Sequence, residues 1–233
     1  MTRATETSGG RERWRHLALL ISLLLLFILS PFVIALRFGV VLINIVGVAV
    51  LLSGTYAVSK RKRFFAATVI LAAASVVLSG LILALPGHWI VLAGHVCLLV
   101  LLGLFSVSIL ANVLSAGSIT ADKIYGAICV YLLIGYAWAF VYAIIEELLP
   151  GSSSGLGEMG PVGYIGRVMQ LRYFSFITLT TVGYGDIVPQ SQVARTFATL
   201  EAVVGQIYLA VLVARLVGLH IVHANISQSL KEK

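Results

Sequence analysis

Charged residues are scarce in this chain of 233 residues, of which 11% are Asp, Glu, Lys or Arg and 60% are hydrophobic. Soluble domains carry about 25% charged residues, so this composition excludes a soluble globular protein. Repeated apolar runs of about 20 residues, the length of a helix that crosses a bilayer, account for it. The chain is therefore expected to be an all-α membrane protein that crosses the bilayer several times.

Cysteine and catalytic motifs are also lacking. The two cysteines, Cys97 and Cys129, lie inside apolar runs, so neither a disulfide nor a metal site is expected. The sequence has no two-histidine-plus-carboxylate cluster, no nucleophile elbow and no phosphate-binding loop. We therefore predict no catalytic residue, no cofactor and no enzyme activity. The basic residues that give the net charge of +7 lie beside the apolar runs, so this charge does not indicate a nucleic-acid partner.

Six apolar runs are long enough to be transmembrane helices. They are expected at about 17–36, 40–58, 64–85, 88–114, 121–149 and 194–219. A further apolar and aromatic run at about 168–180 covers only around half a bilayer at about 1.5 Å per residue. It follows a Gly-rich loop at 150–166, and we interpret it as a re-entrant helix.

The placement of Lys and Arg gives the expected orientation. The strongest signal is the run Lys60-Arg61-Lys62-Arg63, between the second and third apolar runs. If both termini are cytoplasmic, most of the basic residues lie on the cytoplasmic side, and the outer side holds Arg37, Arg167, Arg172 and Arg195. We therefore expect a multi-pass protein of the cell membrane with cytoplasmic termini, in contact with membrane lipids.

One segment, between the re-entrant run and the last apolar run, indicates a chemistry. It reads Thr181-Val182-Gly183-Tyr184-Gly185. A dehydrated cation needs several oxygen ligands, and a backbone supplies them only if successive carbonyls point the same way. Gly183 and Gly185 can adopt positive φ angles, which favours that arrangement.

These five residues are letter for letter the selectivity filter of potassium channels. The chain resembles prokaryotic six-span potassium channels of the voltage-gated-like superfamily, strongly over 170–220 and only in architecture before that. The resemblance implies K⁺ sites formed by the Thr181 hydroxyl and by the carbonyls of Thr181, Val182, Gly183 and Tyr184. Because one chain offers one oxygen per level, a closed ring requires several copies around a common axis, and the resemblance implies that there are four, a homotetramer.

Four further residues are expected to support the filter. Thr180 lies at the end of the re-entrant helix, where it either helps to stabilise a cation or only satisfies a local backbone group. The match to the family motif implies a supporting role for Asp186, directly after the filter, and Tyr173 is one plausible partner for Asp186. Glu201 lies inside the last apolar run, where an ionisable group is costly. It is expected behind the filter, and two readings stay open: a role in conduction, or a pair that only stabilises helix packing.

The last apolar run also carries candidates for the cavity and gate. Similar inner helices have a glycine near Gly205 that allows bending, and a glycine needed only for packing is the alternative. Gln206, Leu209 and Val213 recur at helical spacing and are expected to line the cavity and the lower gate. Glu146, Glu147 and Glu158 are expected on the outer side, either near the ion entrance or simply as a solvated loop surface.

The fourth apolar run lacks the arginines that voltage-gated relatives carry at every third position. Residues 89–114 contain no Lys or Arg, so the membrane field has little charge to act on. We therefore expect no conventional voltage sensing. The linker to the fifth run, 115–121, is short, which favours packing of each four-helix unit against the pore of its own subunit.

The sequence thus predicts five parts: a cytoplasmic basic arm at 1–16, a four-helix sensor-like domain at 17–114, a linker at 115–121, a pore domain at 122–220 and a cytoplasmic tail at 221–233. The predicted function is passive, potassium-selective ion flux. The alternatives are a less selective cation channel and a non-conducting membrane scaffold.

Overall fold

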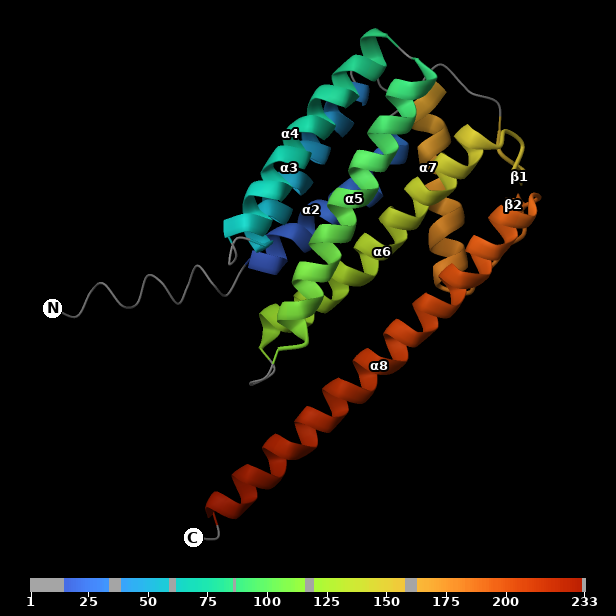
Figure 1. Ribbon diagram of the computed structural model, residues 1–233. Coiled ribbons are helices and arrows are strands. Elements are labelled where there is room, and N and C mark those ends of the chain that lie inside the picture. The colour runs from blue at the N-terminus through green and yellow to red at the C-terminus, as the bar shows by residue number, and fades with distance from the viewer. Residues whose placement is uncertain are drawn as a thin grey trace, which may run out of the picture.

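The computed structural model describes residues 15–33, 39–58, 62–85, 87–115, 120–157 and 163–231. Most of the predicted basic arm, Lys60, Arg61, the centre of the 115–121 linker and Glu158 lie outside the described residues. The described part is almost entirely helical (Figure 1). Its elements are α2 (Arg15–Val33), α3 (Gly39–Val58), α4 (Lys62–Ala84), α5 (His88–Val113), α6 (Ala121–Leu148), β1 (Ser153–Ser154), α7 (Gly163–Leu179), β2 (Val188–Pro189) and α8 (Gln192–Lys231).

Four of the described helices are long and apolar enough to cross a membrane. They are α4, α5, α6 and the first part of α8, with spans of 19, 26, 28 and 24 residues. The described parts of α2 and α3 contain shorter apolar stretches, His16–Phe32 and Ile45–Thr55. The protein is therefore a helical, multi-pass membrane protein, and a layout of six spans stays a prediction.

Two helices differ in length from the expectation. α7 begins at Gly163, five residues earlier than the apolar run suggested, and its 17 residues extend about 26 Å, still short of a bilayer core of about 30 Å. α8 continues to Lys231 instead of ending near 219. The sequence from 216 onward has no proline and few glycines, so falling hydropathy there marks the expected end of the membrane span and not the end of the helix.

Helices α2 to α5 form a unit that packs on the α6 helix of the same chain. α5 runs along α6. The core between α2, α5 and α6 contains Leu19, Leu101, Phe105 and Leu133, each with no exposed surface. Gly54 lets α3 approach α5 closely, because a Cβ at this position would overlap the ring of Phe105.

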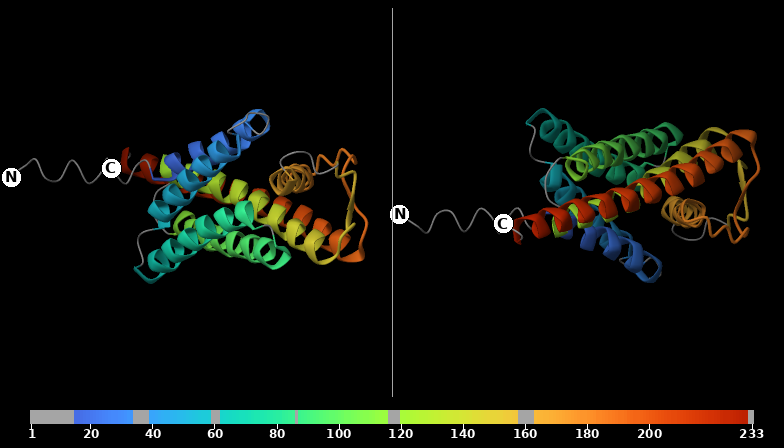
Figure 2. Two further views of the ribbon diagram at one scale, coloured as in Figure 1. Left: turned by 90° about the horizontal axis from the view of Figure 1, so that it is seen from above. Right: turned by 90° about the horizontal axis from the view of Figure 1, so that it is seen from below.

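A second core joins α6, α7 and α8. It contains Tyr142, Leu171, Phe174 and Ile177, which are at least 92% buried. Gly135 of α6 admits the ring of Phe176, since an added Cβ would lie 2.7 Å from that ring. Figure 2 shows α7 beside α6 and α8, away from α3 and α4. This second core holds the segment that follows α7.

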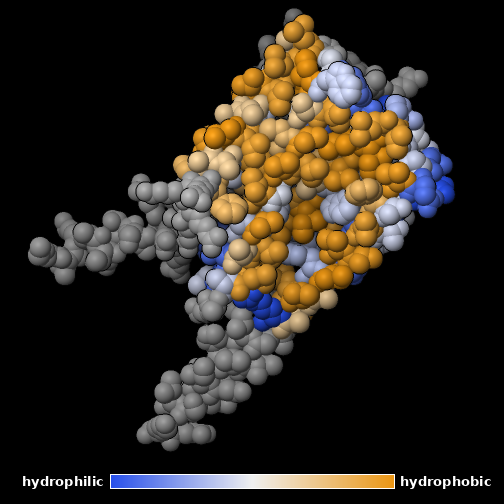
Figure 3. Space-filling view, viewed as in Figure 1, coloured by the Kyte–Doolittle hydropathy of each residue, from blue (hydrophilic) through white to orange (hydrophobic). Residues whose placement is uncertain are grey.

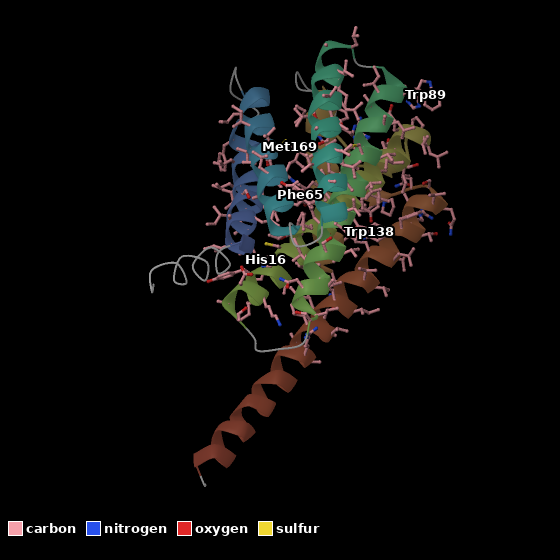
Figure 4. All side chains as sticks on the ribbon, turned by 60° about the vertical axis from the view of Figure 1, so that its left-hand side comes forward. His16, Phe65, Trp89, Trp138 and Met169 are labelled. Atoms are coloured by element: carbon pink, nitrogen blue, oxygen red, sulfur yellow. The ribbon has the colours of Figure 1, made fainter. Side chains whose placement is uncertain are left out.

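The two ends of the molecule differ. The short strands β1 and β2 lie at one end, whereas α2 begins and α8 finishes toward the other (Figure 1). Figure 4 shows His16 and Trp89 at opposite ends of the helical bundle. Between these ends, the face formed by α4 and α5 is a broad apolar surface (Figure 3). Its exposed side chains include Ile70, Val77, Val96, Val100 and Val107, as expected of a surface in contact with lipid.

At the end where α2 begins, α2 is tied to the start of α6. Asp122 accepts the backbone N–H of His16 at 3.1 Å through Oδ1, and its Oδ2 lies 2.7 Å from Nδ1 of the His16 ring. Thr120 is the N-cap of α6, where its hydroxyl accepts the Lys123 N–H at 3.3 Å. Asp122 therefore connects two helices, besides its favourable position in the first turn of α6.

Candidate functional site

The backbone of residues 181–185 has an alternating conformation. Thr181, Gly183 and Gly185 have positive φ angles of 59°, 54° and 79°, whereas Val182 and Tyr184 between them do not. Thr181 has the only positive φ of a non-glycine residue in the described part of the chain, a conformation that costs such a residue roughly 1–2 kcal/mol. Alternation of this kind turns successive carbonyls toward a common side. A strand of regular β structure would instead point them alternately to opposite sides.

The start of this segment is fixed to the end of α7. The Thr181 N–H donates to the Thr178 carbonyl at 2.9 Å, and the Gly183 N–H donates to the Ile177 carbonyl at 3.1 Å. The Thr180 hydroxyl donates to the Phe176 carbonyl at 2.6 Å, so it satisfies a local backbone group. These bonds hold the first residues of the segment against the C-terminal turn of α7.

Asp186 is held from two directions. Tyr173 of α7 donates its phenol to Asp186 Oδ2 at 2.7 Å. This hydrogen bond, followed by desolvation and the negative charge of Asp186, raises the pKa of Tyr173. On the other side Gly155, with φ of 80°, lies so close that a Cβ would overlap the Asp186 carbonyl oxygen. The structure thus brings Tyr173 and Asp186 together beside the end of residues 181–185.

The loop before α7 supports the strand β2, which follows residues 181–185. β1 pairs antiparallel with β2, with Ser153 opposite Pro189 and Ser154 opposite Val188. Glu146 organises this loop, because its carboxylate accepts the N–H groups of Gly151 at 2.8 Å and Ser153 at 3.1 Å. Glu146 therefore stabilises the loop and does not point freely to solvent. Sequence reasoning missed this role.

Glu201 of α8 is fully buried, in contact with α6 and α7. Its Oε2 accepts the Tyr142 hydroxyl of α6 at 2.6 Å, and its Oε1 accepts the Ser175 hydroxyl of α7 at 2.5 Å. The Ser175 hydroxyl also lies 2.8 Å from the Gly135 carbonyl. One carboxyl group thus joins three helices. Tyr142 and Ser175 were missed from the sequence, since neither belongs to a local motif with Glu201.

The cavity and gate candidates lie along α8. Gly205 is buried against the end of α7, where a Cβ would come within 2.5 Å of the Leu179 carbonyl oxygen. Gln206, Leu209 and Val213 are exposed in the single chain. α8 is helical through Gly205, so in this structure the glycine allows close packing without a break in the helix.

Arg172, which is predicted on the outer side, projects from α7 toward α2. Its side of the membrane stays a prediction. Its guanidinium donates to Ser30 Oγ and lies 5.4 Å from the ring centroid of Phe27. A lone cation in an apolar, aromatic helix was the available signal.

α5 carries histidine but neither Lys nor Arg. His95 is buried, and its ring stacks on Tyr164 of α7 at 5.0 Å between centroids. Neither ring nitrogen has a hydrogen-bond partner among the described residues. His88 at the start of α5 instead pairs with Glu147 at 2.5 Å. Within the described ranges, no three His, Cys, Asp or Glu residues come together as a candidate metal site.

Comparison with known proteins agrees with this geometry. Residues 152–219, from the loop before α7 through most of the α8 span, match the family described as "Ion channel". "Two pore potassium channel a" from Oryza sativa subsp. japonica is 31% identical over 86 residues, which are 37% of this chain and 21% of that protein. The chain thus spans about a fifth of the length of this curated relative. No solved structure matches this chain. The chain carries an ion channel domain, and these matches point to a channel and not to an enzyme.

Proposed function

We propose that the protein is a potassium-selective channel that mediates passive K⁺ flux. The observation that carries this proposal is the alternating backbone of residues 181–185, which have the potassium-filter sequence inside the ion channel domain. In the proposed filter, K⁺ is bound by the Thr181 hydroxyl and by the carbonyls of Thr181, Val182, Gly183 and Tyr184. Thr180, Tyr173, Asp186 and Glu201 support it through the contacts described above.

The proposed assembly is a homotetramer with the filter on its axis. A single chain supplies one carbonyl per level, whereas a dehydrated K⁺ needs a ring of them. The filter segment is open in the single chain, with Val182 exposed by 52% and Tyr184 by 72%. α8 also presents apolar side chains, among them Leu200, Val203, Ile207, Val211 and Val213. Neighbouring copies would cover part of this surface.

The proposed ion path continues from the filter along α8, lined by Gln206, Leu209 and Val213, with Gly205 as the close contact to the pore helix. Because α5 contains no Lys or Arg, we propose that the channel is gated by a stimulus other than the membrane voltage acting on a conventional sensor. The packing of α2 and α5 on α6 of the same chain favours a subunit that keeps its four-helix unit beside its own pore. Six spans in the cell membrane, with cytoplasmic termini, complete the proposal.

Flux from liposomes tests this function. Purified protein is reconstituted and the release of K⁺ is followed under a potassium gradient, then the release of Na⁺ under a sodium gradient. The proposal expects K⁺ flux that greatly exceeds Na⁺ flux. Equal permeation of both ions would favour a less selective cation channel, and absence of both fluxes would favour a non-conducting scaffold.

A glycine pair provides matched variants. Gly183→Ala places a Cβ on a residue with φ of 54°, so it should remove K⁺ flux by disturbing the alternating backbone. Gly103→Ala, in α5, meets no heavy atom within 4 Å and should leave flux unchanged. Equal flux through both variants would show that the conformation of residues 181–185 does not control permeation.

A further inference from the structure

A cavity of about 410 Å³ lies between the four-helix unit and the re-entrant helix. All six helices from α2 to α7 contribute to its wall, and most of the lining side chains are apolar, such as Leu26, Val50, Leu98 and Met169. Met169 is labelled in Figure 4. The volume falls within the range of about 300–1,000 Å³ that is usual for small-molecule sites.

The charged side chain in this wall is Arg172 of α7. It is surrounded by a hydroxyl and by aromatic rings: it donates to Ser30 Oγ and lies 5.4 Å and 5.6 Å from the ring centroids of Phe27 and Tyr136. Within the part of the chain that the structure describes, no carboxylate lies within ion-pairing distance of Arg172. A guanidinium at membrane depth without an anionic partner is costly, and cation–π contacts offset only part of that cost.

We infer that this cavity is a binding site for an amphipathic anion, whose acyl chain lies along the apolar wall and whose anionic head pairs with Arg172. An apolar cavity with a single cation fits a ligand that has a long hydrocarbon part and one negative group. The planar guanidinium suits both a carboxylate and a phosphate, because it can donate two parallel hydrogen bonds to either. The ligand source is thus a fatty acid or an anionic phospholipid of the membrane.

The position of the site gives the ligand a route to the pore. Arg172 is adjacent to Tyr173, which binds Asp186 beside the filter segment, and is three residues before Ser175, which binds Glu201. A ligand that pairs with Arg172 therefore acts on α7, the helix from which Tyr173 and Ser175 bind the two filter supports Asp186 and Glu201. Occupancy of the cavity links lipid composition to the support of residues 181–185.

Two glycines allow the cavity to be filled without changing Arg172. Gly47 of α3 and Gly80 of α4 both contribute to the wall, and a Cβ at either meets no heavy atom within 4 Å. Gly47→Leu and Gly80→Leu should therefore occupy the space of the acyl chain and preserve the cation. Gly103→Leu is the matched control, since Gly103 has the same free space but lies outside the cavity wall.

The test is a binding measurement on the purified full-length protein in a neutral detergent. Oleate, phosphatidylglycerol and the zwitterionic phosphatidylcholine are added separately, and retained ligand is counted by native mass spectrometry together with the shift in apparent melting temperature. The inference expects retention of oleate, phosphatidylglycerol or both, and not of phosphatidylcholine. Retention of oleate alone identifies a free carboxylate, and retention of phosphatidylglycerol alone identifies a phospholipid.

The variants decide whether the cavity is the site. Arg172→Gln should weaken retention of the anionic ligand at least about tenfold, and Arg172→Lys should weaken it less because the charge is kept. The Gly47→Leu and Gly80→Leu double variant should also weaken it, whereas Gly103→Leu should not. Equal retention of phosphatidylcholine, or full retention by the filled cavity, would overturn the inference. The filled-cavity variants keep the test decisive if Arg172→Gln fails to fold, and because the readout is binding, failure here is separate from failure of the proposed ion selectivity.

Discussion

Tyr142 donates its hydroxyl to Glu201 across 2.6 Å, and this bond joins α6 to α8. The other carboxyl oxygen accepts from Ser175 on α7, so the same group also fixes α7. Glu201 has no exposed surface, and both of its oxygens are satisfied. The buried acid therefore helps to hold the C-terminal half of α7, which ends at Leu179 directly before residues 180–185.

Removal of one hydroxyl from this network should lower the stability of the fold. Tyr142→Phe leaves Glu201 Oε2 buried without its partner, and a buried group that loses its hydrogen bond costs about 1–3 kcal/mol. The apparent free energy of unfolding in detergent should fall by this amount, and Glu201→Gln should have a similar effect. The double variant should lose less than the sum, with a coupling of about 0.5–3 kcal/mol.

Tyr131→Phe is the control for this cycle. Tyr131 also lies on α6, where its ring stacks on Tyr208, but its hydroxyl bonds to none of the described residues. Its loss should change the stability by much less than the loss of the Tyr142 hydroxyl. Additive effects of Tyr142→Phe and Glu201→Gln would show that the two side chains act independently.

The contact between Gly205 and Leu179 distinguishes a hinge from a packing glycine. A Cβ at position 205 would lie 2.5 Å from the Leu179 carbonyl oxygen, and that oxygen belongs to backbone that cannot move aside easily. Gly205→Ala should therefore destabilise the protein by about 1–3 kcal/mol, the usual cost of overpacking. Thermal unfolding measures this, with Gly103→Ala as the variant that should cost nothing. If Gly205→Ala keeps full stability and only alters gating, flexibility is the main role of the glycine.

Local sequence was sufficient to predict the features that depend on neighbouring residues. The glycines at 183 and 185 indicated an unusual backbone, and hydropathy placed α4, α5, α6 and the first part of α8 close to their observed bounds. The positive φ of Thr181 was not predicted, because a β-branched residue gives no local signal for that conformation.

Long-range partners could not be predicted in the same way. Tyr142 and Ser175 are separated from Glu201 by 59 and 26 residues, and only the packing of three helices brings them together. The contacts of Arg172 with Ser30 and Phe27 were not predicted, because charge counting assigns each basic residue to a side of the membrane and does not ask which helix face it occupies. The second half of α8 was missed because hydropathy reports on the membrane and not on helical propensity.

The bond between Tyr173 and Asp186 predicts a specific alkaline behaviour. Since this bond raises the pKa of Tyr173 above the ordinary value of about 10, the phenol should stay protonated, and the contact should persist, at pH values where an ordinary tyrosine ionises. The contact is lost only when the pH rises through the raised pKa. Phenolate absorbance of the protein minus that of Tyr173→Phe measures this titration, and a Tyr173 that ionises like free tyrosine would contradict the prediction.

The two histidine–carboxylate pairs should differ in their importance for stability. His16 is 1% exposed, and Asp122 binds both its backbone N–H and its ring, so Asp122→Asn should weaken the attachment of α2 to α6 and cost about 1–3 kcal/mol. The His88–Glu147 pair lies in a more exposed position, and Glu147→Gln should cost less than about 1 kcal/mol. Thermal unfolding of the two variants at the same pH compares them. Proteolysis at the α2 end should increase only in Asp122→Asn, and equal sensitivity of both variants would show that the buried pair does not hold α2 in place.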